Sequence, residues 1–123
     1  MHELSIAASV LDGVLAFVEL HRVTKVLAVR LAIGELTCVE VEQLRFCYTA
    51  VTRETALEEA MLEIDRVEAR VKCSHCSYQG SPKYWEDALS GAPVPTLQCP
   101  ECGKAAEPVQ GHECLIKAIQ YVA

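Results

Sequence analysis

Four of the seven cysteines fall into two Cys-x-x-Cys pairs, Cys73/Cys76 and Cys99/Cys102. A two-residue gap lets one tight turn aim both thiolates at the same point, and four converging thiolates suit the tetrahedral coordination of zinc. The 22 residues between the pairs slightly exceed the usual zinc-ribbon interval, which affects the loop and not the ligands. Gly103 suits the left-handed position on which such a turn ends. The spacing therefore predicts one zinc site with four cysteine ligands.

Two disulfides or two redox-active dithiols are the alternatives to a zinc site. Neither pair is expected at the start of a helix that follows a strand, where a thioredoxin-type dithiol stands. A zinc ion held by four thiolates has no open position for substrate, so we expect a structural role. The sequence also shows no phosphate-binding glycine loop, nucleophile elbow or paired-carboxylate site, and we expect no enzyme activity.

The first three residues, Met1-His2-Glu3, form a second candidate metal site. A large residue at position 2 hinders removal of the initiator methionine, so the α-amine of Met1 is expected to be free. That amine, the backbone nitrogen of His2 and the His2 imidazole can close adjacent chelate rings, and Glu3 adds a carboxylate or another amide. Such nitrogen and oxygen donors suit Ni(II) or Cu(II) better than zinc. An ordinary polar N-terminus is the more frequent alternative for a histidine at this position.

The other cysteines and one histidine have less specific patterns. Cys38 is expected at a helix start, Cys47 on the apolar stripe of that helix, and Cys114 at the beginning of the last strand, where buried structural roles are the default. His75 lies between two predicted ligands and is expected to be solvated, with replacement of a thiolate as the alternative. Tyr84 and Trp85 are expected to cover the metal-binding turns, or to contact a partner.

The hydrophobic periodicity predicts the elements that position these residues. They are a helix over 4–20, a strand over 27–33, a second helix opened by a Thr37-Cys38-Val39-Glu40 capping box, a strand over 60–71 with a bulge or twist at Asp65-Arg66, and a strand over 114–122. Residues 72–111 are rich in proline and glycine, poor in branched aliphatic residues, and need a metal staple. We therefore predict an α+β fold: a two-helix, mixed-sheet domain of residues 1–71 plus 112–123, with an inserted zinc-ribbon lobe of residues 72–111.

Composition excludes several function classes. The chain has 123 residues, is 51% hydrophobic, and carries a net charge of −6, which disfavours nucleic-acid binding. No apolar run is expected to reach the roughly 20 residues of a membrane span, so we expect no membrane interaction. No secretory signal is visible, and the paired thiols suit a reducing compartment, so a cytoplasmic location is expected.

Taken together, these motifs resemble those of the HypA/HybF family of hydrogenase nickel-incorporation proteins. The resemblance rests on Met1-His2-Glu3 before an amphipathic helix, Gly34-Glu35-Leu36 after a strand, Cys38-Val39-Glu40 before a second helix, residues 58–64, and the two cysteine pairs in this order. It runs from end to end of the chain.

The resemblance implies a nickel metallochaperone. It implies Ni(II) bound at His2, with Met1 and Glu3 adjacent, and delivered to the large subunit of [NiFe]-hydrogenase together with a GTP-hydrolysing nickel chaperone. It also implies structural Zn(II) at Cys73, Cys76, Cys99 and Cys102. The alternatives are a zinc-ribbon adaptor without nickel transfer, a zinc-ribbon module that binds nucleic acid, and a dithiol oxidoreductase.

Overall fold

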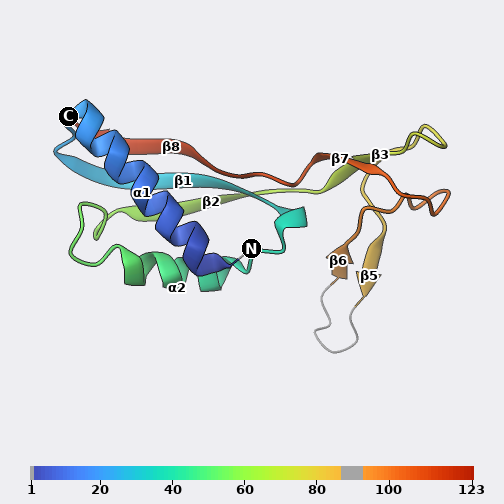
Figure 1. Ribbon diagram of the computed structural model, residues 1–123, viewed down its shortest axis with the longest axis horizontal. Helices are drawn as coiled ribbons and strands as arrows, with labels where there is room; N and C mark the ends of the chain where they lie inside the picture. The colour runs from blue at the N-terminus through green and yellow to red at the C-terminus, as the bar shows by residue number, and fades with distance from the viewer. Residues whose placement is uncertain (1, 87–92) are drawn as a thin grey trace. The chain divides into compact units, whose positions relative to one another are not determined.

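The computed structural model describes residues 2–86 and 93–123 and divides into two compact units (Figure 1). The first unit comprises Met1–Ala32, Val39–Asp65 and Leu115–Ala123. The second unit comprises Ile33–Cys38 and Arg66–Cys114. Both helices lie in the first unit and strands occur in both, so the predicted α+β class is confirmed. The predicted insert boundaries at residues 72 and 111 fall inside the second unit, which also takes flanking segments on either side of them.

The first unit is built from two helices and most of a three-stranded sheet, whose strands have their last or first one or two residues in the second unit. The helices are α1 (Glu3–His21) and α2 (Val41–Val51), and the sheet has the order β2 (Met61–Val67), β1 (Lys25–Gly34), β8 (Cys114–Val122). Helix α1 ends at His21, and the left-handed conformation of its C-cap residue Arg22 closes the last turn. Val14, Leu31 and Leu44 are completely buried and bring α1, β1 and α2 into one core. The predicted first helix and last strand are thus confirmed.

The start of α2 differs from the predicted capping box. Residues Glu35–Thr37 form a short 3-10 helix, and the Thr37 hydroxyl donates to the carbonyl of Gly34 at 2.7 Å. Glu40 is instead the N-cap of α2, and its carboxylate accepts from the amide of Glu42 at 3.2 Å. The capping-box prediction was wrong because a left-handed turn at Cys38 separates Thr37 from the helix. Cys38 therefore does not lie in the first turn of α2.

The second unit contains short antiparallel strands. One sheet has the order β4 (Gln79–Gly80), β3 (Arg70–Lys72), β7 (Glu107–Gln110), and β5 (Tyr84–Glu86) pairs with β6 (Pro93–Pro95). The strand predicted over 60–71 is interrupted between β2 and β3, beyond the predicted twist at Asp65-Arg66. The register of β3 against β7 also shifts between Arg70 and Val71.

The hydrophobic core of the second unit is small and includes two predicted metal ligands. Val71, Cys73, Cys99 and Ala106 are buried together, and Tyr78 packs against them. Tyr78 therefore has the covering role that was predicted for Tyr84 and Trp85. Trp85 is 65% exposed on β5. Apart from the cysteines, this cluster contains Val71 and Ala106, with Tyr78 packed against them, so we expect the unit to depend on the metal that binds the thiols.

Glu35 and Gly34 of the Gly34-Glu35-Leu36 motif hold three segments of the second unit together. The Glu35 carboxylate accepts from the amide of Ala69 at 2.8 Å and from the hydroxyl of Tyr84 at 2.9 Å. Burial, followed by the hydrogen bond to Glu35, raises the pKa of Tyr84. The amide of Gly34 donates to the carbonyl of Glu113 at 2.7 Å. The motif is therefore structural, and it belongs to the unit that carries the cysteines.

Substitution Gly34→Ala is expected to destabilise the protein by about 3 kcal/mol, because overpacking against backbone has no flexible side chain to relieve it. A Cβ at Gly34 would lie 2.0 Å from the carbonyl oxygen of Gly111. Urea denaturation measures the loss. Gly13→Ala is the matched control, since its Cβ meets only the tip of Ile116 at 3.2 Å and alanine favours the helix. Equal stability of the two variants would contradict this packing.

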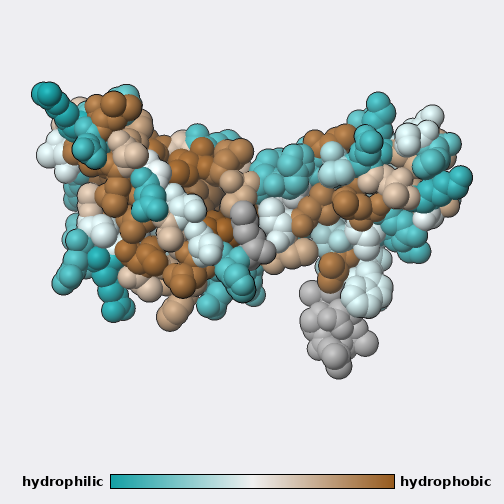
Figure 2. Space-filling model, viewed as in Figure 1, coloured by the Kyte–Doolittle hydropathy of each residue, from teal (hydrophilic) through white to brown (hydrophobic). Residues whose placement is uncertain are grey.

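Helix α1 is long and apolar enough to cross a membrane by length and composition alone. By this criterion, the expectation that no apolar run approaches the length of a membrane span was wrong for α1. A core helix of a soluble protein passes the same test, and Ile6, Val10 and Val14 of α1 are buried within the first unit. Further apolar side chains gather on the visible face of this unit (Figure 2).

Candidate metal centre

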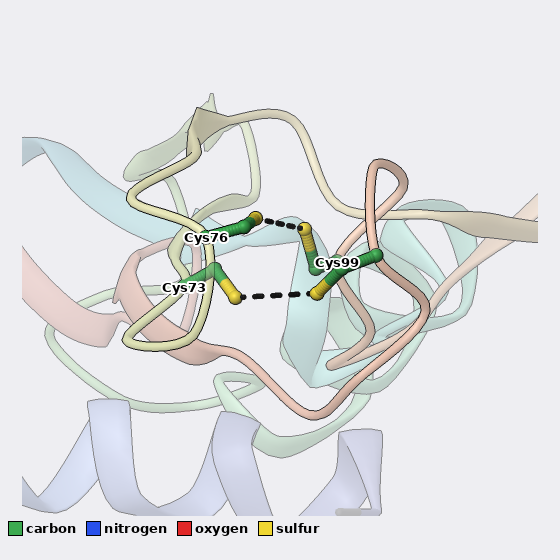
Figure 3. A group of neighbouring side chains, drawn as sticks. Cys73, Cys76 and Cys99 are labelled. Atoms are coloured by element: carbon green, nitrogen blue, oxygen red, sulfur yellow. Dashed lines mark hydrogen bonds between the residues drawn. The ribbon is translucent and has the colours of Figure 1, made fainter.

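The four predicted zinc ligands come together in the second unit. The sulfur atoms of Cys73, Cys76, Cys99 and Cys102 all lie within 4.8 Å of one another. The sulfur of Cys73 is 3.6 Å from that of Cys102. The sulfur of Cys76 is 3.5 Å from that of Cys99, and Figure 3 shows these two side chains pointing toward each other. One cysteine of each pair is buried and the other is exposed. Two turns distant in the sequence thus supply four donors to one point.

Matching turns aim the sulfur atoms of each pair. After β3, the amide of Cys73 donates to the carbonyl of Tyr78 at 2.8 Å, and the amide of His75 donates to the Cys73 sulfur at 3.4 Å. Ser77 follows this pair with a φ of 64°. Gly103 follows the other pair with a φ of 76°, as the sequence predicted, and its amide donates to the carbonyl of Cys99 at 2.9 Å. Both turns therefore end on a left-handed residue.

The electrostatics of the cluster call for a cation. Burial raises the pKa of the Cys73 thiol, but hydrogen bonds from the amides of His75 and Cys76 and with the thiols of Cys102 and Cys76 together lower it to about 7. At Cys76 the amide of Tyr78 lowers the pKa, while the Cys99 thiol and burial raise it overall. Four thiolates so close together repel one another unless a metal neutralises them. The donor set is soft and fits a divalent metal that prefers sulfur.

The N-terminal candidate lies in the first unit. Met1 is outside the described residues. His2 is exposed and is the N-cap residue of α1, where its side chain makes no capping hydrogen bond. The carboxylate of Glu3 accepts from the amide of Glu40 at 3.1 Å, and this hydrogen bond lowers the pKa of Glu3. The start of α1 is thereby joined to the N-cap of α2.

The hydrogen bond between Glu40 and Glu3 was not predicted from the sequence, in which Glu40 was assigned only to a capping box. The amide of Glu40 binds Glu3, and its carboxylate caps α2. The two residues are 37 positions apart, so no local pattern connects them. Among the described residues, one group of at least three potential metal-binding side chains converges, and it consists of the four cysteines. His2 and Glu3 are therefore not part of a preformed group of metal-binding side chains among these residues.

The remaining candidates lie outside the cysteine cluster. Cys38 is exposed, Cys47 is buried and Cys114 is half-buried, and all seven cysteines are free thiols. The buried role predicted for Cys47 is confirmed, whereas that predicted for Cys38 was wrong. His75 is exposed on its turn, as expected.

Comparison with known proteins gives a consistent result. The family model described as "HypA: Hydrogenase/urease nickel incorporation, metallochaperone" matches residues 1–121. A hydrogenase maturation factor HypA from Azotobacter chroococcum is 36% identical, with 98% of each chain covered. One from Methanopyrus kandleri is 35% identical, with 98% of this chain and 92% of the relative covered.

A solved structure has the same fold. The solution structure of the Ni metallochaperone HypA from Helicobacter pylori aligns with a TM-score of 0.68 and 21% identity, covering 100% of this chain and 99% of that one. The resemblance found in the sequence is therefore confirmed over the whole chain. The chain belongs to the HypA family of hydrogenase and urease nickel-incorporation proteins, which are metallochaperones and not enzymes.

Proposed function

We propose that this chain carries Ni(II) at its N-terminus and delivers it for the maturation of [NiFe]-hydrogenase. Nickel is held by the Met1 amine, the backbone and imidazole nitrogens of His2, and a donor of Glu3. The observation that carries the proposal is the exposed His2 at the start of α1, beside a Glu3 whose carboxylate is already engaged by Glu40. Nitrogen and oxygen donors at a chain end suit Ni(II).

The four-cysteine cluster is proposed to hold a structural zinc ion. Its four sulfur atoms leave no position for a transferred ion, and thiolates bind Zn(II) tightly. Cys73 and Cys99 belong to the buried cluster of their unit, so release of the metal would unfold that unit. The thiols must stay reduced, which suits a cytoplasmic location.

A carrier must release its cargo, and the N-terminal donor set allows this. Few protein ligands bind the ion, and the residue that supplies the imidazole is exposed. Protonation of the amine or the imidazole competes with nickel, so affinity falls as the pH falls. We propose as recipients the partners of the hydrogenase pathway, namely a GTP-hydrolysing nickel chaperone and the hydrogenase large subunit.

Nucleic-acid binding is less well supported as an alternative. Residues 72–111 contain Lys72, Lys83 and Lys104 as their only lysines, against four acidic residues: Glu86, Asp87, Glu101 and Glu107. A zinc ion bound by four thiolates adds further negative charge. Binding to nucleic acid whose affinity falls steeply as the salt concentration rises would favour this alternative.

Metal analysis of untagged protein tests the proposal. One zinc per chain is expected before nickel loading, and one additional nickel afterwards, measured by inductively coupled plasma mass spectrometry. Two extra residues placed before Met1 should remove the bound nickel without changing the zinc, because they convert the terminal amine to an amide. Nickel uptake that displaces zinc, or that the extension does not alter, would contradict the proposal.

A further inference from the structure

The second unit contains a pocket of about 340 Å³ whose lining includes none of the four clustered cysteines. The lining combines an aromatic ring, an aliphatic side chain and charges of both signs, and it consists of Glu35, Arg66, Val67, Glu68 and Tyr84. All five residues belong to the second unit. We call these five residues the Glu35 pocket.

The carboxylate of Glu35 is held in place at this pocket. Its oxygen Oε1 accepts from the amide of Ala69 at 2.8 Å and from the hydroxyl of Tyr84 at 2.9 Å. Among the described residues, no group donates to the other oxygen, Oε2. The carboxylate is therefore fixed before any ligand binds, and one of its oxygens is available as an acceptor.

Glu68 adds a second carboxylate to the Glu35 pocket. It is exposed, and its negative charge lies close enough to Tyr84 to contribute to the raised pKa of that residue, after burial and the contact with Glu35. Neither carboxylate forms an ion pair with another described residue, although Arg66 lines the same pocket. Both carboxylates therefore lack a cationic partner within the described part of the chain.

We propose that the Glu35 pocket binds an arginine side chain of a partner protein. A guanidinium group is planar, stays charged and carries several N–H donors, so it can donate to Oε2 of Glu35 and to the Glu68 carboxylate at the same time. Its flat face packs on the ring of Tyr84, and its methylene groups pack against Val67. This docking site goes beyond the carriage of nickel and needs no bound nickel.

Other ligands match the pocket less well. A hard metal ion binds roughly six or more oxygen ligands, whereas the four cysteines are the one converging group of at least three metal-binding side chains among the described residues. A phosphate group would meet two carboxylates against one arginine. A lysine ammonium is a compact point charge without a planar fork or a face that stacks, so we expect arginine to bind more tightly than lysine.

NMR titration of the full-length, zinc-loaded, nickel-free protein tests the proposal. The probe is N-acetyl-arginine N-methylamide, whose only charge is the guanidinium group. It should shift the amide resonances of Val67, Ala69 and Tyr84 saturably, with a dissociation constant on the order of 1 mM, because one side chain makes few contacts. The matched probe is the corresponding citrulline derivative, which has the same length but an uncharged urea group, and it should leave these resonances unchanged.

Three variants connect the binding to the named charges. Glu68→Gln should weaken arginine binding at least about fivefold, because it removes the charge from one acceptor. Arg66→Gln should strengthen binding about twofold, because it removes a like charge from the lining. Glu107→Gln is the matched control, since Glu107 is an exposed glutamate of the same unit outside the Glu35 pocket, and it should bind as the wild type does. The dispersion of the amide resonances shows whether each variant is folded.

Four results would overturn the proposal. They are equal binding of the citrulline derivative, unchanged affinity in Glu68→Gln, weaker binding in Arg66→Gln, and no shift of the pocket amides at about 10 mM probe, tenfold above the expected constant. Because nickel is absent from these titrations, none of these results bears on the N-terminal nickel site, whose failure would be seen in the metal analysis.

Discussion

Replacing Cys99 by serine is expected to remove zinc from the second unit and to unfold that unit, while the first unit stays folded. Cys99 is completely buried, and its sulfur lies 3.5 Å from that of Cys76. Structural zinc contributes about 10–16 kcal/mol in small zinc-binding peptides. A fully buried aliphatic side chain contributes only about 1.5–3 kcal/mol, and Val71 is the one branched aliphatic residue among the described members of this core. The apolar contacts alone therefore cannot offset the conformational entropy of the unit.

Amide NMR spectra of the wild type and of Cys99→Ser measure the effect unit by unit. Resonances of Arg66–Cys114 should collapse to unfolded positions, whereas those of α1 and α2 should keep their dispersion. Cys38→Ser is the matched control, since Cys38 is an exposed thiol of the same unit outside the cluster. It should retain one zinc per chain. If metal-free Cys99→Ser keeps dispersed resonances for the second unit, this unit does not need zinc to fold.

The elements that were predicted correctly have local determinants. Helix α1 is set by apolar residues three and four positions apart, and the cysteine cluster by two short turns with matching left-handed ends. In each case the decisive contacts lie within a few residues, so the sequence pattern contains them.

The predictions that failed depend on contacts between distant segments. The strand predicted to run through 60–71 is interrupted because the amide of Ala69 donates to the Glu35 carboxylate and not to a neighbouring strand. Gln110 likewise donates its side-chain amide to the carbonyl of Glu68 at 2.9 Å. These partners are 34 and 42 positions apart, respectively, and no periodicity in one sequence connects them. The contact of Glu3 with Glu40 was missed for the same reason.

Substitution His2→Ala is expected to abolish specific nickel binding, with affinity reduced at least about a hundredfold, or about 2.7 kcal/mol. The imidazole is the only strong side-chain nitrogen donor of the proposed site, and its removal opens one chelate ring. The fold should not change, because His2 is exposed and its side chain caps no amide of α1. Calorimetric titration of untagged, zinc-loaded protein with Ni(II) measures the affinity, and the zinc content should remain at one per chain.

A second variant separates ligation from positioning at the same end of the helix. Glu3→Gln keeps an oxygen that can accept a hydrogen bond from the Glu40 amide, but it removes the carboxylate charge. The hydrogen bond is then weaker, because its acceptor is neutral. If the Glu3 carboxylate binds nickel, this variant weakens binding; if only its backbone nitrogen does, affinity is nearly retained. His112→Ala is the control, because His112 is also exposed and lies in the second unit. Unchanged nickel affinity in His2→Ala, together with its loss in Cys99→Ser, would place the exchangeable ion on sulfur and reverse the proposed roles of the two sites.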